Sequence, residues 1–246
     1  MTTLCLDFGN SRFKAAIFNA NECTADIILP DDTDATIAEL LQTYQPQRSI
    51  LSSVTNHNIS IEHLLLEHTQ FHKVSANTNL PFTIASSKKE TIGADRLALV
   101  AAAVHFYPLT NNLIIALGSC ITYNFVNQYN HFLGGSISPG LNMRFKAMHQ
   151  FTAKLPLIEN YSTEIGIPLV GYDTATNMQS GVVTGICCEL EGIIEKYKER
   201  YGNFNVVLTG GNSAYFASQL KNKIFADSIF LFKGLYALSE LNNCGD

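Results

Sequence analysis

The sequence has little charge, no basic run and no long apolar segment. Only 15% of its 246 residues are Asp, Glu, Lys or Arg, and the formal net charge is −5. Nucleic-acid binding usually requires a basic patch, so these values argue against nucleic acid as a principal partner. The longest apolar stretches, such as residues 113–117, are far shorter than the ~20 residues of a membrane span. The first residues show no basic segment of a secretory signal, so we expect a cytoplasmic protein with no membrane partner.

The sequence also lacks a motif of cysteines and histidines that would bind a metal. Its seven histidines are scattered, and none of its six cysteines forms a C-x-x-C pair or stands near a ligand cluster. We therefore expect no metal site of this kind and no catalytic cysteine. Buried free thiols are expected at the six positions, which are Cys5, Cys23, Cys120, Cys187, Cys188 and Cys244.

The most informative segment that is present begins at Leu4. Residues 4–8 predict a strand with Asp7 near its end, Gly9 predicts a turn, and residues 13–18 predict a returning strand. Such a turn exposes backbone N–H groups that suit an anion. Asp7 would repel a bare phosphate, so we expect a cation or a metal-bound water between them, with Lys14 as a countercharge.

A second segment of the same kind covers residues 113–126, with the turn at Gly118 and Ser119. Two such hairpins, each opening a half of similar length, predict a duplicated α/β fold with domains at residues 1–110 and 111–246. Gly-Ser turns are common, so for either hairpin alone an ordinary turn is the favoured interpretation. Together they favour two halves of a nucleotide-phosphate site. The apolar content of 46% is ample for a core in each half.

Apolar periodicity and capping residues predict the remaining elements. Further strands are expected at residues 22–29, 49–54, 204–208 and 229–232, with residues 132–140 forming a strand that ends in a turn. Helices are expected at residues 34–44, from 58 or 60, and at 92–107, 142–155, 174–201 and 213–220. On the longest helix, Gly181 and Gly185 stand one turn apart, which suits either a core helix or a dimer contact.

Several weaker motifs follow the hairpins. Asp95 and Arg96 stand at the start of a predicted helix, where free N–H groups favour anions. A first-turn capping acid is the commoner role of a residue such as Asp95 and remains an alternative. Thr174 occupies the expected N-cap of the longest helix, and capping alone would explain it. Glycines in residues 134–140 and 209–212 allow a ligand to approach the backbone closely.

In this order, the motifs closely resemble those of the type III pantothenate kinases. The matching segments span nearly the whole chain and are residues 7–11, 93–96, 118–122, 134–140, 152–156 and 209–212. The resemblance implies the duplicated two-domain acetate and sugar kinase/Hsp70/actin (ribonuclease H-like) fold, an α/β fold with mixed sheets. It also implies a homodimer that phosphorylates pantothenate with ATP and Mg²⁺, in the first step of coenzyme A synthesis.

The resemblance implies roles for some of these residues. Asp95 would be the catalytic base, and Asp7 would hold Mg²⁺ through water. ATP would be bound by Asp7, Phe8, Gly9, Asn10, Ser11, Arg12, Phe13, Lys14 and Ser119. Pantothenate would be bound by Ser86, Gly93, Ala94, Asp95, Arg96 and Thr174.

The chain departs from the family pattern at three positions. Ala116 replaces the aspartate that helps to hold K⁺ or NH₄⁺, Asn124 replaces a later acid of the same hairpin, and Ser86 replaces a tyrosine of the substrate pocket. Since Asp7, Asp95 and Arg96 are intact, we expect an active enzyme. The alternatives are a non-catalytic or regulatory relative of the same fold and a kinase for another small alcohol.

Overall fold

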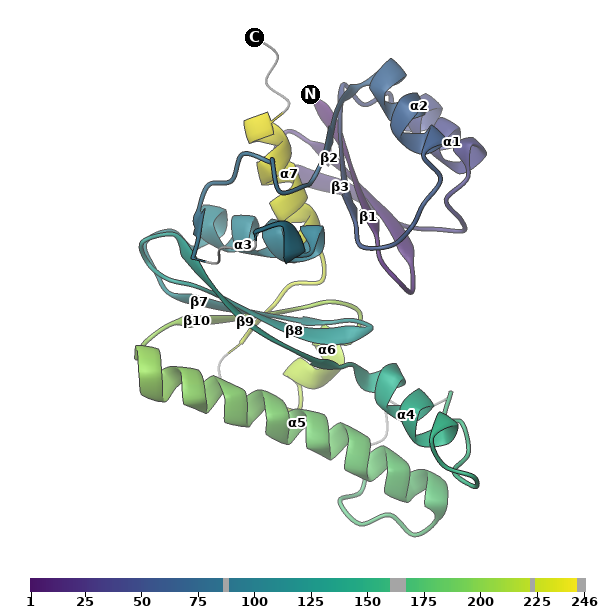
Figure 1. Ribbon diagram of the computed structural model, residues 1–246, viewed down its shortest axis with the longest axis vertical. Helices are drawn as coiled ribbons and strands as arrows, with labels where there is room; N and C mark the ends of the chain where they lie inside the picture. Colours follow the sequence, from purple (N-terminus) through teal and green to yellow (C-terminus); the bar gives the residue numbers. More distant parts are fainter. Residues whose placement is uncertain (86–88, 160–166, 222–223, 243–246) are drawn as a thin grey trace. The chain divides into compact units, whose positions relative to one another are not determined.

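A computed structural model describes residues 1–85, 89–159, 167–221 and 224–242 (Figure 1). The chain packs as two compact units, and each unit is built from separate segments. Unit 1 contains residues 1–110, 124–134 and 229–246, and unit 2 contains residues 111–123 and 135–228. Within the described ranges, no helix combines the length and the apolar character that crossing a membrane would require.

Unit 1 is built on a five-stranded sheet with the order β3-β2-β1-β4-β5. Strands β1 (Thr2–Phe8), β2 (Phe13–Asn19) and β3 (Glu22–Leu29) form an antiparallel meander. Strands β4 (Arg48–Ser53) and β5 (Gln70–Lys73) are added in parallel beyond β1. Because β1 and β4 are parallel, their carboxyl ends lie side by side, and this edge holds Asp7.

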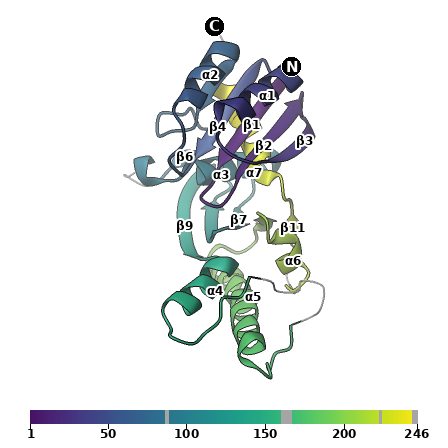
Figure 2. The ribbon, with the colours of Figure 1, turned by 90° about the vertical axis from the view of Figure 1, so that its right-hand side faces the viewer.

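Alternating side chains of β1 serve the two faces of this sheet. Leu4, Leu6 and Phe8 are fully buried in a core formed with α1 (Asp34–Tyr44) and α2 (Ser60–His68). The opposite face contacts α7 (Phe230–Asn242), which packs on both β1 and β4. Figure 2 shows this layering of helices about the sheet of unit 1.

Helices α3 (Ala94–Phe106) and α7 pack closely against each other in unit 1. A Cβ atom placed on Gly234 of α7 would lie 1.9 Å from the carbonyl oxygen of Ala98 in α3, so only glycine fits at this crossing. The prediction of a final strand at residues 229–232 is wrong, because Phe230, Leu235 and Leu238 form the buried stripe of a helix instead. The short apolar run alone does not distinguish the two structures.

Unit 2 contains strands β7 (Asn112–Leu117), β10 (Asn205–Thr209) and β11 (Phe225–Ala226) and helices α4 (Leu141–Gln150), α5 (Thr174–Tyr201) and α6 (Ser213–Ala217). Strands β8 (Cys120–Val126) and β9 (His131–Pro139) each cross from one unit to the other. The second sheet has the order β11-β10-β7-β8-β9-β6, in which β6 (Thr83–Ile84) pairs in parallel with the first residues of β9.

The sequence predicted most of these elements. The structure confirms both hairpins and the bounds of β3, α1 and α5. The prediction missed β5, β6, β11 and the short 3₁₀ turn η1 (Lys89–Thr91), and it made α4 five residues too long, to 155 instead of Gln150. The three missed strands are short and lie at the edges of their sheets, where alternation gives little signal.

Candidate functional site

Asp7 lies near the carboxyl end of β1, in register with Lys14 on β2 and Ser52 on β4. The hydroxyl of Ser52 donates a hydrogen bond to Oδ1 of Asp7 over 3.3 Å. The sequence analysis missed Ser52, because only the parallel pairing of β1 with β4 brings the two residues together. Its signal was a polar residue at the end of a buried strand, which is weak when the strand order is unknown.

The turn between β1 and β2 follows Asp7. The backbone N–H of Gly9 donates to the carbonyl of Arg12 over 3.1 Å, which closes the turn. Asn10, Ser11 and Arg12 are exposed at its tip. This loop therefore offers polar donors and one cation to an anionic ligand near the half-buried carboxylate of Asp7.

Asp95 lies in the first turn of α3, after the N-cap residue Gly93. A Cβ atom on Gly93 would lie 2.5 Å from Oδ1 of Asp95, so the glycine leaves the space that the carboxylate occupies. Burial raises the pKa of Asp95, while the backbone N–H and the charge of Arg96 act in the opposite direction. The result is a desolvated carboxyl group that is more basic than an ordinary aspartate.

The two carboxyl groups of unit 1 influence each other. Burial is the main cause that raises the pKa of Asp7 to about 7, and the charge of Asp95 raises it further, while Ser52 and Lys14 oppose the shift. Two half-buried acids in one electrostatic environment favour a bound cation, which would stabilise both charged forms. Within the described part of the chain, no three His, Cys, Asp or Glu side chains gather as metal ligands. A metal ion at Asp7 would therefore take its other ligands from water, from the bound ligand or from neutral oxygens of the protein.

Arg96 extends from α3 toward the strands β8 and β9. Its Nε donates to Oδ1 of Asn124 over 2.6 Å, and its guanidinium lies 5.7 Å from the centre of the Phe132 ring. Asn124 is fully buried. The neutral amide therefore orients the guanidinium without cancelling its charge.

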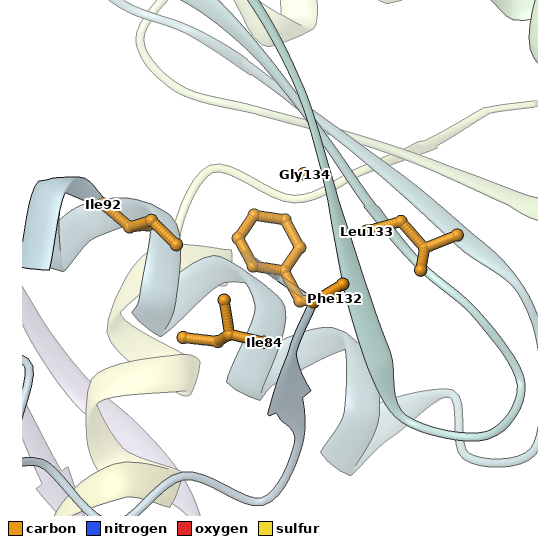
Figure 3. Close-up of a pocket in the computed structure, with 6 residues that line it drawn as sticks. Ile84, Ile92, Phe132, Leu133 and Gly134 are labelled. Carbon is orange, nitrogen blue, oxygen red and sulfur yellow. The ribbon is translucent and has the colours of Figure 1, made fainter. Parts of the chain in front are cut away.

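A small hollow lies beside this part of unit 1 (Figure 3). Its volume is about 150 Å³, and Figure 3 shows apolar side chains around it. The hollow is lined by Ile84, Ala85, Ile92, Phe132, Leu133 and Gly134. The ring of Phe132 is shared between this lining and the contact with Arg96, so an apolar surface and a cation adjoin each other.

The turn of the second hairpin belongs to unit 2. The backbone N–H of Gly118 donates to the carbonyl of Cys120 over 3.0 Å. Gly140, which follows β9, packs against this turn so closely that a Cβ atom would lie 2.3 Å from the carbonyl oxygen of Gly118. Gly210 has a φ of 93° and packs in the same way against Leu117. Glycine is thus required at both positions, because a side chain would separate the backbones that meet at the end of β7.

The expected N-cap role of Thr174 is wrong. The N-cap of α5 is Asp173, whose side chain accepts a hydrogen bond from the backbone N–H of Thr176 over 2.7 Å. The backbone N–H of Asp173 in turn donates to the Thr176 hydroxyl over 3.0 Å. Thr174 is the exposed first residue of the helix. An N-cap role therefore does not explain why a threonine stands at position 174.

The predicted site residues divide between the units. The hairpin residues from Asp7 to Lys14 and the segment from Gly93 to Arg96 belong to unit 1, whereas Ser119 and Thr174 belong to unit 2. Ser86 lies outside the described residues. The expectation of buried thiols is confirmed for Cys5 but is wrong for Cys188, which is exposed, and Cys23, Cys120 and Cys187 are half-buried. Cys244 lies outside the described residues.

Solved structures define the class of fold. The chain is similar to a structure described as a Baf family transcriptional activator from Campylobacter jejuni, with a TM-score of 0.61 and 20% identity over 97% of this chain and 98% of that one. It is also similar to a structure described as an N-acetylmannosamine kinase from Listeria monocytogenes, with a TM-score of 0.56 and 13% identity over 98% and 99% of the two chains. The fold is that of the acetate and sugar kinases, Hsp70 and actin, as the sequence predicted.

Sequence relatives define the family within this class. Residues 3–196 match the family model of the type III pantothenate kinases. The chain is 39% identical to the type III pantothenate kinase of Christiangramia forsetii, over 97% of this chain and 98% of the relative. It is 37% identical to that of Cytophaga hutchinsonii, over 97% and 99% of the two chains. The chain belongs to the type III pantothenate kinase family.

The raised pKa of Asp7 predicts a pH-dependent stability. In the folded state this pKa is about 7, against an ordinary value of 3.8, so folding favours the neutral carboxyl group. The contribution of Asp7 to the free energy of unfolding is fully present below pH 3.8, where the carboxyl group is neutral in both states. It is lost as the pH rises through 7. We therefore expect Asp7→Asn to raise the free energy of unfolding at pH 8 by roughly 1–3 kcal/mol, and by much less at pH 4.5.

The measurement is urea unfolding of the variant and the wild type at both pH values, without nucleotide or divalent cation. Glu39→Gln, on the exposed side of α1, is the matched control and should follow the wild type. An equal difference between Asp7→Asn and the wild type at both pH values would contradict the titration of Asp7.

Proposed function

We propose that this protein transfers the γ-phosphoryl group of ATP to the primary hydroxyl of pantothenate, the first step of coenzyme A synthesis. The proposal rests above all on Asp95 and Arg96 at the start of α3, in a chain that belongs to the type III pantothenate kinase family. A cytoplasmic location is part of the proposal, because ATP is available there.

Asp95 is the proposed base for the substrate hydroxyl. Phosphoryl transfer depends mainly on alignment and charge neutralisation, and the alcohol loses its proton as the new bond forms. Burial raises the pKa of Asp95, which makes its carboxylate a stronger acceptor for that proton. The space left by Gly93 supports this role, because it keeps the carboxylate close to the helix N-terminus.

Arg96 and the adjoining hollow fit the two chemical ends of pantothenate. The guanidinium would pair with the carboxylate of the substrate, and Asn124 would fix its orientation. The apolar hollow beside Phe132 would take the dimethyl group. Gly93, Ala94, Thr174 and Ser86 complete the proposed substrate-binding set.

The two hairpin turns are the proposed ATP-binding elements, one in each unit. In unit 1 these are the residues from Asp7 to Lys14, and in unit 2 the turn residue is Ser119. Asp7 would hold Mg²⁺ through water, and its raised pKa supports a site that is completed by a cation. When bound, Mg²⁺ would neutralise the phosphate oxygens. Lys14, in register with Asp7, would supply a second positive charge.

A non-catalytic relative of the same fold is the second candidate function. The observation that favours it is Ala116, since this half-buried position in register with Thr209 carries no charge where the family has a carboxylate. Nucleotide binding without turnover would distinguish this candidate from the kinase. Turnover with another small alcohol, but not with pantothenate, would instead identify a kinase of different specificity.

We predict that Asp95→Asn abolishes pantothenate phosphorylation while the fold is retained. The amide has the same shape as the carboxyl group but cannot accept the proton, and loss of a general base costs on the order of 10²–10⁴-fold in rate. The measurement is the initial rate in a coupled assay, together with ATP binding. Glu67→Gln, on the exposed side of α2, is the control. A variant with most of the wild-type kcat would leave Asp95 only a capping role.

We also predict that the rate is indifferent to K⁺. A K⁺ ion requires several oxygen ligands, and the methyl group of Ala116 supplies none where the family has a carboxylate. The test compares initial rates in K⁺, NH₄⁺ and a bulky organic cation at equal ionic strength, which should be the same. A large and saturable activation by K⁺ would show that other groups of the chain form the site.

A homodimer with α5 near the interface is the last part of the proposal. A Cβ atom on Gly181 or Gly185 would meet nothing within 4 Å in the single chain, so another helix could approach there. Leu169, Val170 and Tyr172, just before this helix, are 75%, 80% and 84% exposed.

Sedimentation at micromolar concentration should therefore show a dimer. Gly181→Glu should shift it toward the monomer, because a charge would be placed in the interface. Leu66→Glu, at an exposed position of α2 in unit 1, is the control for the effect of an added charge away from α5. A wild-type monomer, or equal effects of the two variants, would contradict this arrangement.

A further inference from the structure

The carboxylate of Glu189 on α5 receives hydrogen bonds from three other elements of unit 2. The Tyr123 hydroxyl on β8 donates to its Oε1 over 2.8 Å, and the Ser138 hydroxyl on β9 donates to the same oxygen. The guanidinium of Arg144 on α4 donates to Oε2 and forms an ion pair. Burial opposes ionisation, but these three donors together hold the pKa of Glu189 below its usual range. Glu189 is therefore a charged hub that joins four elements.

The hub is connected to the turn of the second hairpin through the end of β9. Nε of Arg144 donates to the carbonyl of Pro139 over 2.9 Å. The next residue, Gly140, donates its backbone N–H to the carbonyl of Ser119 over 3.1 Å. Its missing Cβ allows the backbone to touch Gly118. Displacement of Arg144 would therefore release the backbone that holds the Gly118–Ser119 turn.

A second connection runs along β8. Tyr123 lies on β8, four residues after Ser119 of the turn, and its ring is fully buried. Burial and the charge of Glu189 raise its pKa, so the hydroxyl stays protonated and remains a donor. The hairpin is thus attached to Glu189 both through its own strand and through the segment that covers its turn.

We propose that Glu189 is a positioning residue for ATP, which fixes the Gly118–Ser119 turn through Tyr123, Ser138 and Arg144. The inference rests on the proposed function, in which this turn binds the nucleotide. An ion pair between two helices adds little stability compared with an apolar pair of the same volume. A fully hydrogen-bonded network instead specifies one geometry. Such precision matters where phosphates must be aligned.

The test uses two variants that break the network at different atoms. Glu189→Gln keeps the volume, but its amide must either place a donor toward Arg144 or withdraw an acceptor from Tyr123 and Ser138. Arg144→Lys keeps the charge but loses the Nε bond to Pro139. Both should raise the KM for ATP on the order of tenfold and leave the KM for pantothenate within about twofold of the wild type.

Glu195→Gln is the control, since Glu195 is an exposed carboxylate of the same helix that pairs only loosely, at 3.7 Å, with Lys198. It should change neither KM. Equal increases in both KM values, or a lower urea midpoint with both KM values unchanged, would overturn the positioning role. Such results would leave Glu189 as part of the packing between helices.

Direct binding of a fluorescent ATP analogue separates this inference from the proposed function. If the wild type binds the analogue but does not phosphorylate pantothenate, weaker binding by Glu189→Gln and Arg144→Lys would still support the positioning role. Unchanged binding by both variants would overturn it. A wild type that binds no nucleotide would overturn both proposals.

Discussion

The burial of Asp7 within the electrostatic reach of Asp95 is the constraint on which the first unit depends. Parallel pairing of β1 with β4 places one carboxyl group at the sheet edge, and the start of α3 supplies the other. Neither group is surrounded by enough water to be charged without penalty, as the raised pKa of each shows. The folded state is therefore less stable at these positions than an apolar core would be, and a cation that neutralises them would recover that stability.

The second unit meets a different constraint, which is the close approach of backbones. Gly140 and Gly210 bring their segments against the end of β7 and the turn that follows it, at distances that no side chain would permit. Close packing alone does not fix the orientation of the Gly118–Ser119 turn. The polar network around Glu189 restricts that orientation, because each of its donors comes from a separate element.

Local patterns predicted what depends on local sequence. Both hairpins and the 28-residue helix α5 followed from alternation, glycine turns and helical periodicity. Asp7 and Asp95 were predicted to be functional, but their mutual influence depends on an approach of distant segments that the sequence does not encode locally. Ser52 was missed for the same reason. The last helix was mistaken for a strand, because its apolar run acquires a helical role only against the small residues of α3, such as Ala98.

Because unit 1 is built from segments that are far apart in the sequence, it cannot complete its fold until the end of the chain has been synthesised. Helix α3 carries Asp95, and its packing partner α7 begins only at Phe230, after all of unit 2 has been synthesised. While the nascent chain emerges from the ribosome, the apolar surface of α3 that will meet Gly234 has no native cover. Unit 1 therefore remains incompletely packed until α7 has been synthesised. During this time a chaperone that recognises exposed apolar helices could bind α3.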